Sequence, residues 1–333
     1  MERHAFFHEV GAGQWQCDLC PKSCRLKAGE IGACRVRAGS RDGIACLVYG
    51  EPVARHVDPI EKKPLNHYFP GTKVFSLGTQ GCNLRCRGCQ NDSLSRGAYE
   101  PMGEKIAPEL VVKMAERNGC SMIAYTYNEP IVWAEYAMDI AFAAREKGMR
   151  NVLVSAGAIR REALERFIEP FDAANIDLKG FSEAFYRSWA GGSLETVLET
   201  LEVLHRRPGF WLEITTLVIP GVNDSDEMLE SEFAWYVKHL GGDVPLHLSA
   251  FHPACEALEI GCTPFETLER AREMATRAGI RFVYLGNVRE NADTVCPKCG
   301  EPLVMRRGYR VRLGAFERGA CQKCGEKIPG VWN

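Results

Sequence analysis

The residues with the clearest chemistry lie in a short glycine-rich stretch from Gly78 to Asn91, which contains Cys82, Cys86 and Cys89. Their C-x3-C-x2-C spacing lets three thiolates bind one inorganic cluster. Four-iron clusters normally take four cysteine ligands, so three local cysteines would leave one iron for a ligand that is not protein. An open coordination position distinguishes a reactive metal site from a structural one. The stretch therefore predicts a catalytic iron–sulfur cluster, and the alternative is an incidental zinc site.

A second group of cysteines lies near the N-terminus, where Cys17, Cys20, Cys24 and Cys34 follow a C-x2-C-x3-C-x9-C pattern. Four cysteines suffice for one closed site. Zinc would take four thiolates in a tetrahedron, and an auxiliary iron–sulfur cluster would take the same four. The spacing predicts a second metal site and leaves both metals open.

A third group lies near the C-terminus, where Cys296, Cys299, Cys321 and Cys324 form two C-x2-C-G knuckles. This pattern predicts a zinc ribbon, with mononuclear iron in the same four-sulfur geometry as the minor alternative. Apolar residues alternate with arginines between the knuckles, which predicts a half-buried strand with a basic outer face. We expect a solvated face rather than a docking surface for a phosphate-rich partner. The apolar residues of the strand are Tyr309, Val311 and Leu313. The basic face has Arg310 and Arg312, and Arg306, Arg307 and Arg318 extend it.

The composition limits the class of protein. The chain has 333 residues, 15 cysteines and a formal net charge of −2, so its overall charge gives no reason to expect a nucleic-acid partner. Tight C-x2-C spacing indicates metal sites in a reducing compartment rather than disulfides. We see no signal peptide and no apolar run of membrane-spanning length, and we expect a cytoplasmic protein.

The elements that must position these cysteines alternate between strands and helices from Lys73 onward. Expected strands are 73–78, 121–127, 151–156, 173–178, 210–219, 245–251 and 281–286, and expected helices include 107–118, 130–147, 225–240 and 263–278. The last helix opens on Thr263 and Glu266, which predicts a capping box. Seven such strands indicate an α/β fold, either a parallel β/α barrel or an open doubly wound sheet, and both bind ligands at the carboxyl ends of the strands.

We expect three parts in the chain. A cysteine-rich N-terminal segment covers residues 1–70, the β/α domain covers 71–290, and a ribbon-like module covers 291–333. His67 lies in the proline-rich linker between the first two parts, and we expect it to be a hydrogen-bonded histidine in a packed turn rather than a catalytic residue.

The loop from Gly81 to Asn91 resembles the signature of radical S-adenosylmethionine (radical SAM) enzymes. The segments 125–130, 176–180, 217–224 and 251–253 are similar to the pyruvate formate-lyase-activating-enzyme branch. The N-terminal cysteines, the ribbon and Gly286-Asn287-Val288 together resemble one subgroup, the AmmeMemoRadiSam-system radical SAM enzymes. The resemblance covers nearly the whole chain and implies a partial parallel (β/α) barrel of the TIM type.

The resemblance also implies roles for individual residues. Cys82, Cys86 and Cys89 would be the catalytic ligands of a [4Fe-4S] cluster. Glu129 would accept the ammonium group of S-adenosylmethionine, Ser155 could contact its ribose, and Asn223 and His252 are weaker candidates. The expected cofactor-binding residues are Tyr127, Asn128, Glu129, Pro130, Ser155, Asp177 and Lys179. The family usually has an aromatic residue where this chain has Gly88, so its adenine contacts cannot be carried over.

The implied activity is reductive cleavage of S-adenosylmethionine to a 5′-deoxyadenosyl radical, which abstracts hydrogen from an unidentified substrate. The branch suggests a protein glycyl residue, as in activases. Two alternatives stay open: radical modification of RNA or a peptide docked on the ribbon, and a non-catalytic zinc-ribbon protein that binds nucleic acid. The implied partners are a substrate protein, an electron donor such as flavodoxin or ferredoxin, and the companion proteins of the AmmeMemoRadiSam subgroup.

Overall fold

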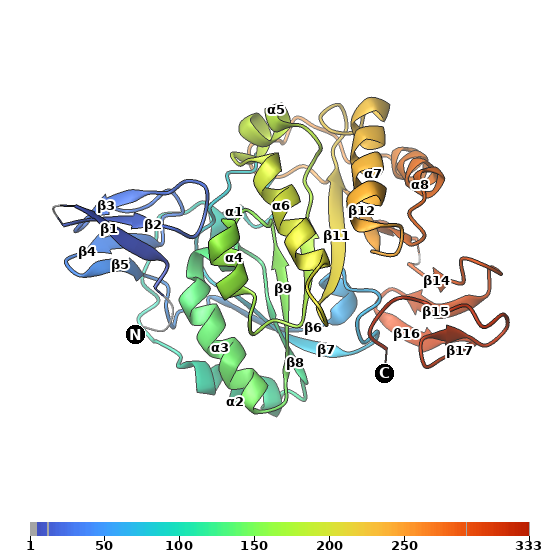
Figure 1. Ribbon diagram of the computed structural model, residues 1–333, viewed down its shortest axis with the longest axis horizontal. Helices are drawn as coiled ribbons and strands as arrows, with labels where there is room; N and C mark the ends of the chain where they lie inside the picture. Colours follow the sequence, from blue (N-terminus) through green and yellow to red (C-terminus); the bar gives the residue numbers. More distant parts are fainter. Residues whose placement is uncertain (1–4, 12, 291, 333) are drawn as a thin grey trace.

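The computed structural model describes residues 5–11, 13–290 and 292–332 (Figure 1). The boundary expected at residue 291 lies outside the described residues. A central α/β domain is flanked by a small N-terminal β-module and, on its opposite side, a C-terminal β-module.

The central sheet has eight strands in the order β13-β12-β11-β10-β9-β8-β7-β6, and all neighbours except β6 and β7 are parallel. The expected strands agree with the observed ones within two residues. A doubly wound sheet reverses its strand order at one point, and this sheet does not. The strands are β6 (Ala54–Pro59), β7 (Lys73–Gly78), β8 (Met122–Tyr125), β9 (Arg150–Ser155), β10 (Ala173–Asp177), β11 (Trp211–Val218), β12 (Leu246–Ala250) and β13 (Val283–Gly286).

Strand β6 is the antiparallel edge of this sheet, although it precedes the boundary that we expected at residue 70. The described residues show no pairing between β6 and β13, so the sheet is not closed into a full barrel. The sequential order, together with the helices packed along its outer side in Figure 1, agrees with a partial barrel.

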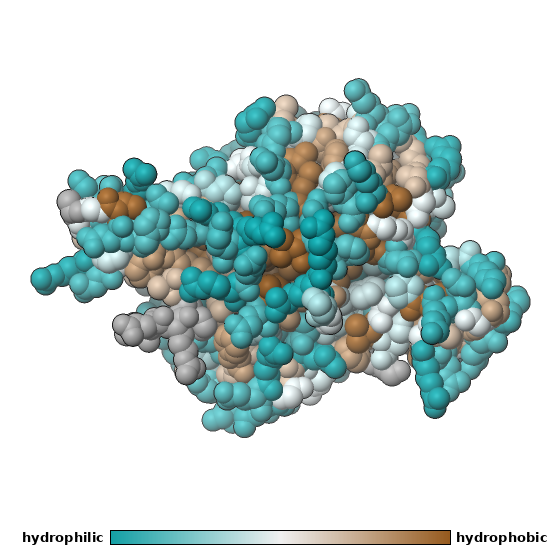
Figure 2. Space-filling model, viewed as in Figure 1, coloured by the Kyte–Doolittle hydropathy of each residue, from teal (hydrophilic) through white to brown (hydrophobic). Residues whose placement is uncertain are grey.

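The helices bury their apolar faces in one continuous core with the sheet. On the face in Figure 2 most outward side chains are hydrophilic, and hydrophobic ones show mainly between the central helices. The helices are η1 (Ile60–Lys62), α1 (Asp92–Ser95), α2 (Pro108–Arg117), η2 (Pro130–Trp133), α3 (Ala134–Glu146), α4 (Arg161–Phe167), α5 (Glu183–Phe185), η3 (Tyr186–Ala190), α6 (Leu194–His205), α7 (Asp226–Leu240) and α8 (Phe265–Ala278). No described helix has the length and apolar character needed to cross a membrane.

Two local predictions were wrong. The helix expected over 130–147 begins as a 3-10 turn, η2, before α3 continues it. The capping box at α8 does not form, because the Thr263 hydroxyl donates to the carbonyl of Val218 and accepts from the amide of Phe251. Thr263 therefore joins the loop after β12 to the end of β11 rather than capping the helix.

The N-terminal module consists of a three-stranded sheet and a hairpin. The sheet contains β1 (Phe7–Gly11), β2 (Gln14–Cys17) and β3 (Arg25–Lys27), and the hairpin contains β4 (Arg37–Ser40) and β5 (Gly43–Cys46). The C-terminal module contains β14 (Thr294–Val295), β15 (Pro302–Arg307), β16 (Arg310–Leu313), β17 (Phe316–Glu317) and β18 (Ala320–Cys321).

Arg306 ties the C-terminal module to the central domain. We expected this arginine on the exposed basic face, and that prediction was wrong: its side chain is buried, donates to the Asn66 carbonyl at 2.6 Å and lies 3.8 Å from the Glu61 carboxylate. The prediction of a half-buried strand with Tyr309, Val311 and Leu313 on its buried side was also wrong in part, because Tyr309 and Leu313 are exposed. Besides Arg306 of β15, Val311 of β16 packs near Gly71 and Val331 pairs with Tyr68.

Candidate active site

One large cavity of about 860 Å³ lies at the carboxyl ends of the parallel strands. It contains the three loop cysteines and every other predicted site residue of the central domain except Pro130, which is buried at the start of η2. Parallel strands end at the same edge of a sheet, so loops that are far apart in the sequence converge there. The predicted residues that line the cavity are Cys82, Cys86, Cys89, Tyr127, Asn128, Glu129, Ser155, Asp177 and Lys179.

Asn128 holds the start of the cysteine loop. Its side-chain amide donates to the carbonyls of Gln80 (3.0 Å) and Gly81 (2.8 Å), and its oxygen accepts from the Thr79 amide at 3.0 Å. Tyr127 precedes it with a φ of 69°, a left-handed conformation that costs a non-glycine residue roughly 1–3 kcal/mol. This backbone turns Asn128 toward the loop, so Asn128 positions the cysteines.

The other side of the cysteine loop is bound to η3 and to Arg96. The amides of Arg85 and Arg87 donate to the carbonyls of Ala190 (2.7 Å) and Trp189 (3.0 Å). The Arg96 guanidinium donates to the Arg85 carbonyl at 2.9 Å. The loop is thus fixed by backbone contacts on both sides, which leaves its thiols directed at the cavity.

Glu129 is a buried carboxylate that three donors already hold. Its oxygens accept from the Ser155 hydroxyl (2.7 Å), the Ala156 amide (2.8 Å) and the Ile131 amide (3.2 Å). Burial raises the pKa of Glu129, and these hydrogen bonds oppose the rise. Ser155 supports this carboxylate and also lines the cavity, so its contact with a ribose stays a prediction.

Asp177 and Lys179 form a pair on the cavity wall, with 2.9 Å between the lysine nitrogen and a carboxylate oxygen. The strand alternation predicted that both side chains point to the same face. Burial alone would lower the pKa of Lys179, but Asp177 and Cys86 raise it above its ordinary value. The lysine therefore remains a cation next to the cysteine loop.

The Cys82 and Cys86 thiols of the cysteine loop are held in their neutral form by burial, and a bound metal would favour the thiolate form. Burial raises the pKa of Cys82, and the nearby Glu129 carboxylate raises it further. Burial also raises the pKa of Cys86, which Lys179 partly offsets. Three converging thiols with no fourth cysteine among the residues that line this cavity fit a metal cluster with one open position.

Two comparisons relate the chain to known sequences. A model described as the radical SAM superfamily matches residues 76–231. An uncharacterized protein from Methanocaldococcus jannaschii is 38% identical over 333 residues, which covers 98% of this chain and 99% of that protein. Residues 76–231 of this chain are therefore a radical SAM superfamily domain. Such a domain implies a [4Fe-4S] cluster and S-adenosylmethionine as cofactors, and the cysteine loop is the part of the chain that suits such a cluster.

Solved structures resemble parts of this chain. SuiB of Streptococcus suis, bound to S-adenosylmethionine, has a TM-score of 0.50 at 14% identity over 68% of this chain and 53% of that chain. A radical SAM methyltransferase from Sphaerobacter thermophilus has a TM-score of 0.48 at 16% identity, over 66% and 67%. A domain of a pyruvate-formate lyase-activating enzyme from Bacteroides vulgatus has a TM-score of 0.44 at 16% identity, over 49% and 98%.

The structure explains why Gly88 departs from the radical SAM pattern. A Cβ atom at this position would lie 2.7 Å from the Phe251 ring and 3.4 Å from the Trp189 ring. Both rings come from elsewhere in the chain, and Trp189 also lines the cavity. The aromatic surface beside the third cysteine is thus supplied by η3, while residue 88 must stay small.

Gly88→Ala is expected to lower the free energy of unfolding by about 1–3 kcal/mol, because the added methyl overlaps the buried Phe251 ring. Urea denaturation would measure the loss. Gly97→Ala is the matched control, because a Cβ atom at Gly97 would lie 3.7 Å from its nearest neighbour, which is an ordinary contact distance. Adding Phe251→Leu to Gly88→Ala should recover part of the loss. Equal stability of the two alanine variants would contradict this explanation.

Sequence reasoning missed several residues that line the cavity. Trp189 lies in an element that no pattern predicted, and Lys63 packs its ammonium 4.6 Å from the centre of the Tyr127 ring. His247 pairs with the buried Glu213 carboxylate at 2.7 Å. His247 and Ser249 alternate with leucines on β12, and both line the cavity. This alternation could have identified them from the sequence, because it places both side chains on one face of the strand.

The two weaker candidates, Asn223 and His252, do not line the cavity, and neither does His67. Asn223 organises the loop after β11, since it donates to the Lys179 carbonyl and accepts from the Ile219 amide. His252 is exposed and lies 3.4 Å from the sulfur of Cys262. His67 is fully buried beneath the C-terminal module, as expected of a histidine in a packed turn.

His67 is expected to make stability pH-dependent. Its Nδ1 donates to the Pro329 carbonyl at 2.6 Å and its Nε2 accepts from the Tyr284 hydroxyl at 2.5 Å, so the folded ring is neutral. Burial lowers the pKa of His67 from 6.5 to about 4. The unfolded chain then binds more protons between these values, so stability falls as pH falls from 6.5 to 4, by about 3 kcal/mol.

Urea denaturation at several pH values measures this dependence. His67→Gln should flatten the slope of stability against pH in that window, and His56→Gln, at an exposed histidine, should leave it unchanged. An unchanged slope in the His67 variant would show that other groups control the acid sensitivity.

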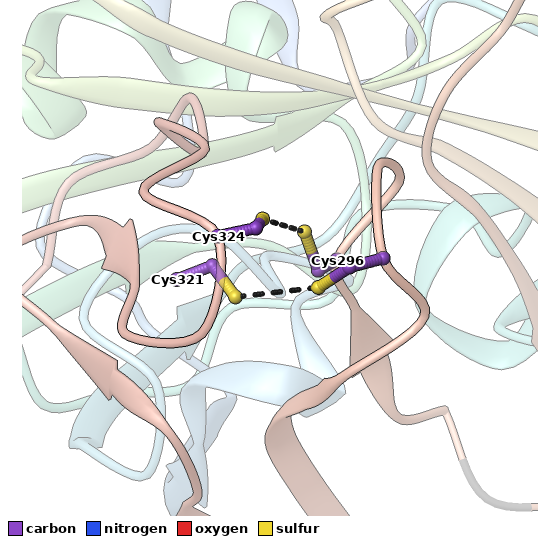
Figure 3. A group of neighbouring side chains, drawn as sticks. Cys296, Cys321 and Cys324 are labelled. Atoms are coloured by element: carbon purple, nitrogen blue, oxygen red, sulfur yellow. Dashed lines mark hydrogen bonds between the residues drawn. The ribbon is translucent and has the colours of Figure 1, made fainter.

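The C-terminal cysteines form a compact metal-binding group (Figure 3). The sulfurs of Cys296 and Cys324 are 3.5 Å apart, those of Cys299 and Cys321 are 3.7 Å apart, and all four lie within 4.8 Å of one another. A tetrahedron with metal–sulfur bonds of ~2.3 Å has sulfurs ~3.8 Å apart. The group could hold one metal ion, and zinc stays our prediction.

Proposed function

We propose that this radical SAM protein cleaves S-adenosylmethionine reductively at a [4Fe-4S] cluster on Cys82, Cys86 and Cys89. When bound, the two cofactors would supply a 5′-deoxyadenosyl radical that abstracts hydrogen from the substrate. The observation that carries the proposal is the convergence of these thiols with Glu129 and the Asp177–Lys179 pair in one cavity.

The residues around the cysteines suit the amino-acid end of S-adenosylmethionine. Glu129 keeps its carboxylate oriented by Ser155 and the Ala156 amide, so it can accept an ammonium group without reorganising. Lys179 provides a fixed cation for a carboxylate, and Asp177 keeps that cation in place. Trp189 lies on the cavity wall beside Gly88, with the Arg87 guanidinium 5.2 Å from its ring centre and the Phe185 ring stacked against it.

The cavity leaves room for a substrate, since its volume lies near the upper end of the ~300–1,000 Å³ range of ligand pockets. Its far wall includes Arg306, Gly308 and Tyr309 of the C-terminal module. We propose an activase-like hydrogen abstraction, in line with the branch that the sequence resembles. A glycyl residue of a protein, the AmmeMemoRadiSam companion proteins and a flavodoxin or ferredoxin donor stay predictions.

A second candidate, radical modification of RNA or a peptide, is favoured by one observation. The turn at Gly308 and Tyr309 lines the cavity, and the exposed Arg310 and Arg312 follow it directly. A long anionic substrate could lie along these arginines and still reach the cavity. Arg310→Ala combined with Arg312→Ala should then weaken substrate binding while cofactor cleavage without substrate continues.

The proposal is tested by anaerobic reconstitution with iron and sulfide, followed by dithionite and S-adenosylmethionine. We expect methionine and 5′-deoxyadenosine in equal amounts. An intact cluster that yields no 5′-deoxyadenosine would refute the proposal. A protein without iron but with stoichiometric zinc would instead favour the non-catalytic zinc-ribbon alternative.

A further inference from the structure

The four N-terminal cysteines surround one small, enclosed cavity. Cys17 ends β2, Cys20 and Cys24 lie in the following loop, and Cys34 approaches from the turn before β4. Three of the four are buried, with exposed fractions of 6–9% for Cys17, Cys20 and Cys34. The other walls are mainly apolar and include Leu19, Leu26, Ile131 and Val132. The cavity lies apart from the candidate active site.

This arrangement differs from the C-terminal ribbon. Among the described residues, only the ribbon brings three or more ligand atoms within 4.8 Å of one another, so the N-terminal sulfurs are spread more widely than one zinc ion requires. The four sulfurs line a cavity instead of lying close enough together to bind a single ion. In a four-iron cluster each thiolate binds a different corner iron, which places the sulfurs farther apart.

We propose that Cys17, Cys20, Cys24 and Cys34 hold a second [4Fe-4S] cluster, with no open iron, rather than zinc. The surroundings suit such a cluster, whose four thiolates make it anionic. The Lys22 and Arg37 side chains both line the cavity. Arg37 is 2% exposed and is held by two 2.7 Å contacts to Glu135, so it cannot turn away.

The second cluster lies directly behind the active-site loop. A Cβ atom at Gly81 would lie 2.7 Å from the Cys34 carbonyl, so the two backbones touch. Cys82 lines the active-site cavity, whereas its neighbour Asn83 lines the N-terminal cavity and bonds the Cys20 sulfur. The tripeptide Gly81–Asn83 is therefore the partition between the two sites.

This placement gives the second cluster a role in electron transfer, and that role, unlike the cluster itself, rests on the proposed function. A one-electron donor protein of the ferredoxin or flavodoxin class would be oxidised while the N-terminal cluster is reduced from the 2+ to the 1+ state. The electron then passes to the active-site cluster, and the N-terminal cluster returns to 2+. One electron moves in each step and no proton is transferred.

The metal content of two variants tests the cluster without any assay of activity. A Cys82/Cys86/Cys89→Ala triple variant should keep about four irons and four sulfides per chain after anaerobic reconstitution, with the spectrum of a four-iron cluster. The double variant Cys20→Ala/Cys24→Ala should contain about four fewer irons per chain than the wild-type protein. Two zinc ions and no iron in the triple variant would overturn the proposal.

Cys46→Ala is the matched control, because Cys46 belongs to the same module but does not line the cavity. It should retain all the iron of the wild type. Zinc retained by the ribbon cysteines in the Cys20/Cys24 variant would show that the rest of the chain is folded. A folded Cys20/Cys24 variant that keeps the full iron content of the wild type would also overturn the proposed ligand set.

Electron paramagnetic resonance of the fully reduced protein tests the placement. Two reduced clusters on either side of a tripeptide should broaden or split each other's signals, and each cluster-deficient variant should show one simple signal. A wild-type spectrum equal to the sum of the two variants would refute the electron-transfer role. Absence of 5′-deoxyadenosine with both signals present would refute the proposed function alone.

Discussion

Cys86→Ala is expected to reduce the formation of 5′-deoxyadenosine from S-adenosylmethionine by at least ~100-fold. Cys86 lies in the middle of the loop and beside Lys179, whose pKa it raises. Removing a ligand leaves two thiols, and even changes to residues that only support a metal ligand cost 10–100-fold in metal affinity or activity. Iron content should fall by about four per chain.

Cys120→Ala is the matched control for this change. Cys120 is buried after α2 and does not line the active-site cavity, so the variant should keep its iron and its activity. The assay is anaerobic quantification of 5′-deoxyadenosine after addition of dithionite. Undiminished cleavage in Cys86→Ala would show that the cluster is bound elsewhere.

Arg306→Ala is expected to destabilise the protein by about 3–5 kcal/mol, as is typical when one partner of a buried ion pair is removed. The guanidinium donates to the carbonyls of Asn66 and Ala292 and to the Thr294 hydroxyl. It also offsets the buried carboxylate of Glu61, whose pKa is raised by burial. The variant would leave the two carbonyls without this donor, and it would remove the cation that offsets the carboxylate, which would keep the hydrogen bond from the Gly71 amide.

The loss should concentrate at the contact between the C-terminal module and the central domain. Urea denaturation measures its size, and limited proteolysis should show earlier cleavage near residues 292–307 than in the wild type. Arg312→Ala, at an exposed arginine of the same hairpin, should change stability by no more than about 0.5 kcal/mol. Similar stability of both variants would mean that Arg306 does not anchor the module.

Local chemistry in the sequence determined much of this protein. The cysteine spacings identified all three thiol groups, and apolar runs located the seven parallel strands within two residues. The strand-end positions of Glu129, Asp177 and Lys179 predicted that they would meet, because parallel strands present their carboxyl ends at the same edge. These features depend on residues that are close together in the chain.

Only the tertiary structure decided the contacts between distant segments. It placed Phe251 and Trp189 against Gly88, turned Asn128 and Ser155 into supports for the loop and for Glu129, and buried Arg306 against Asn66. No sequence pattern encodes a contact across 240 residues, because the periodicity of a strand reports which face is covered but not what covers it. For the same reason the N-terminal spacing left two metals open, and our proposal of a four-iron cluster there rests on the positions of the four sulfurs.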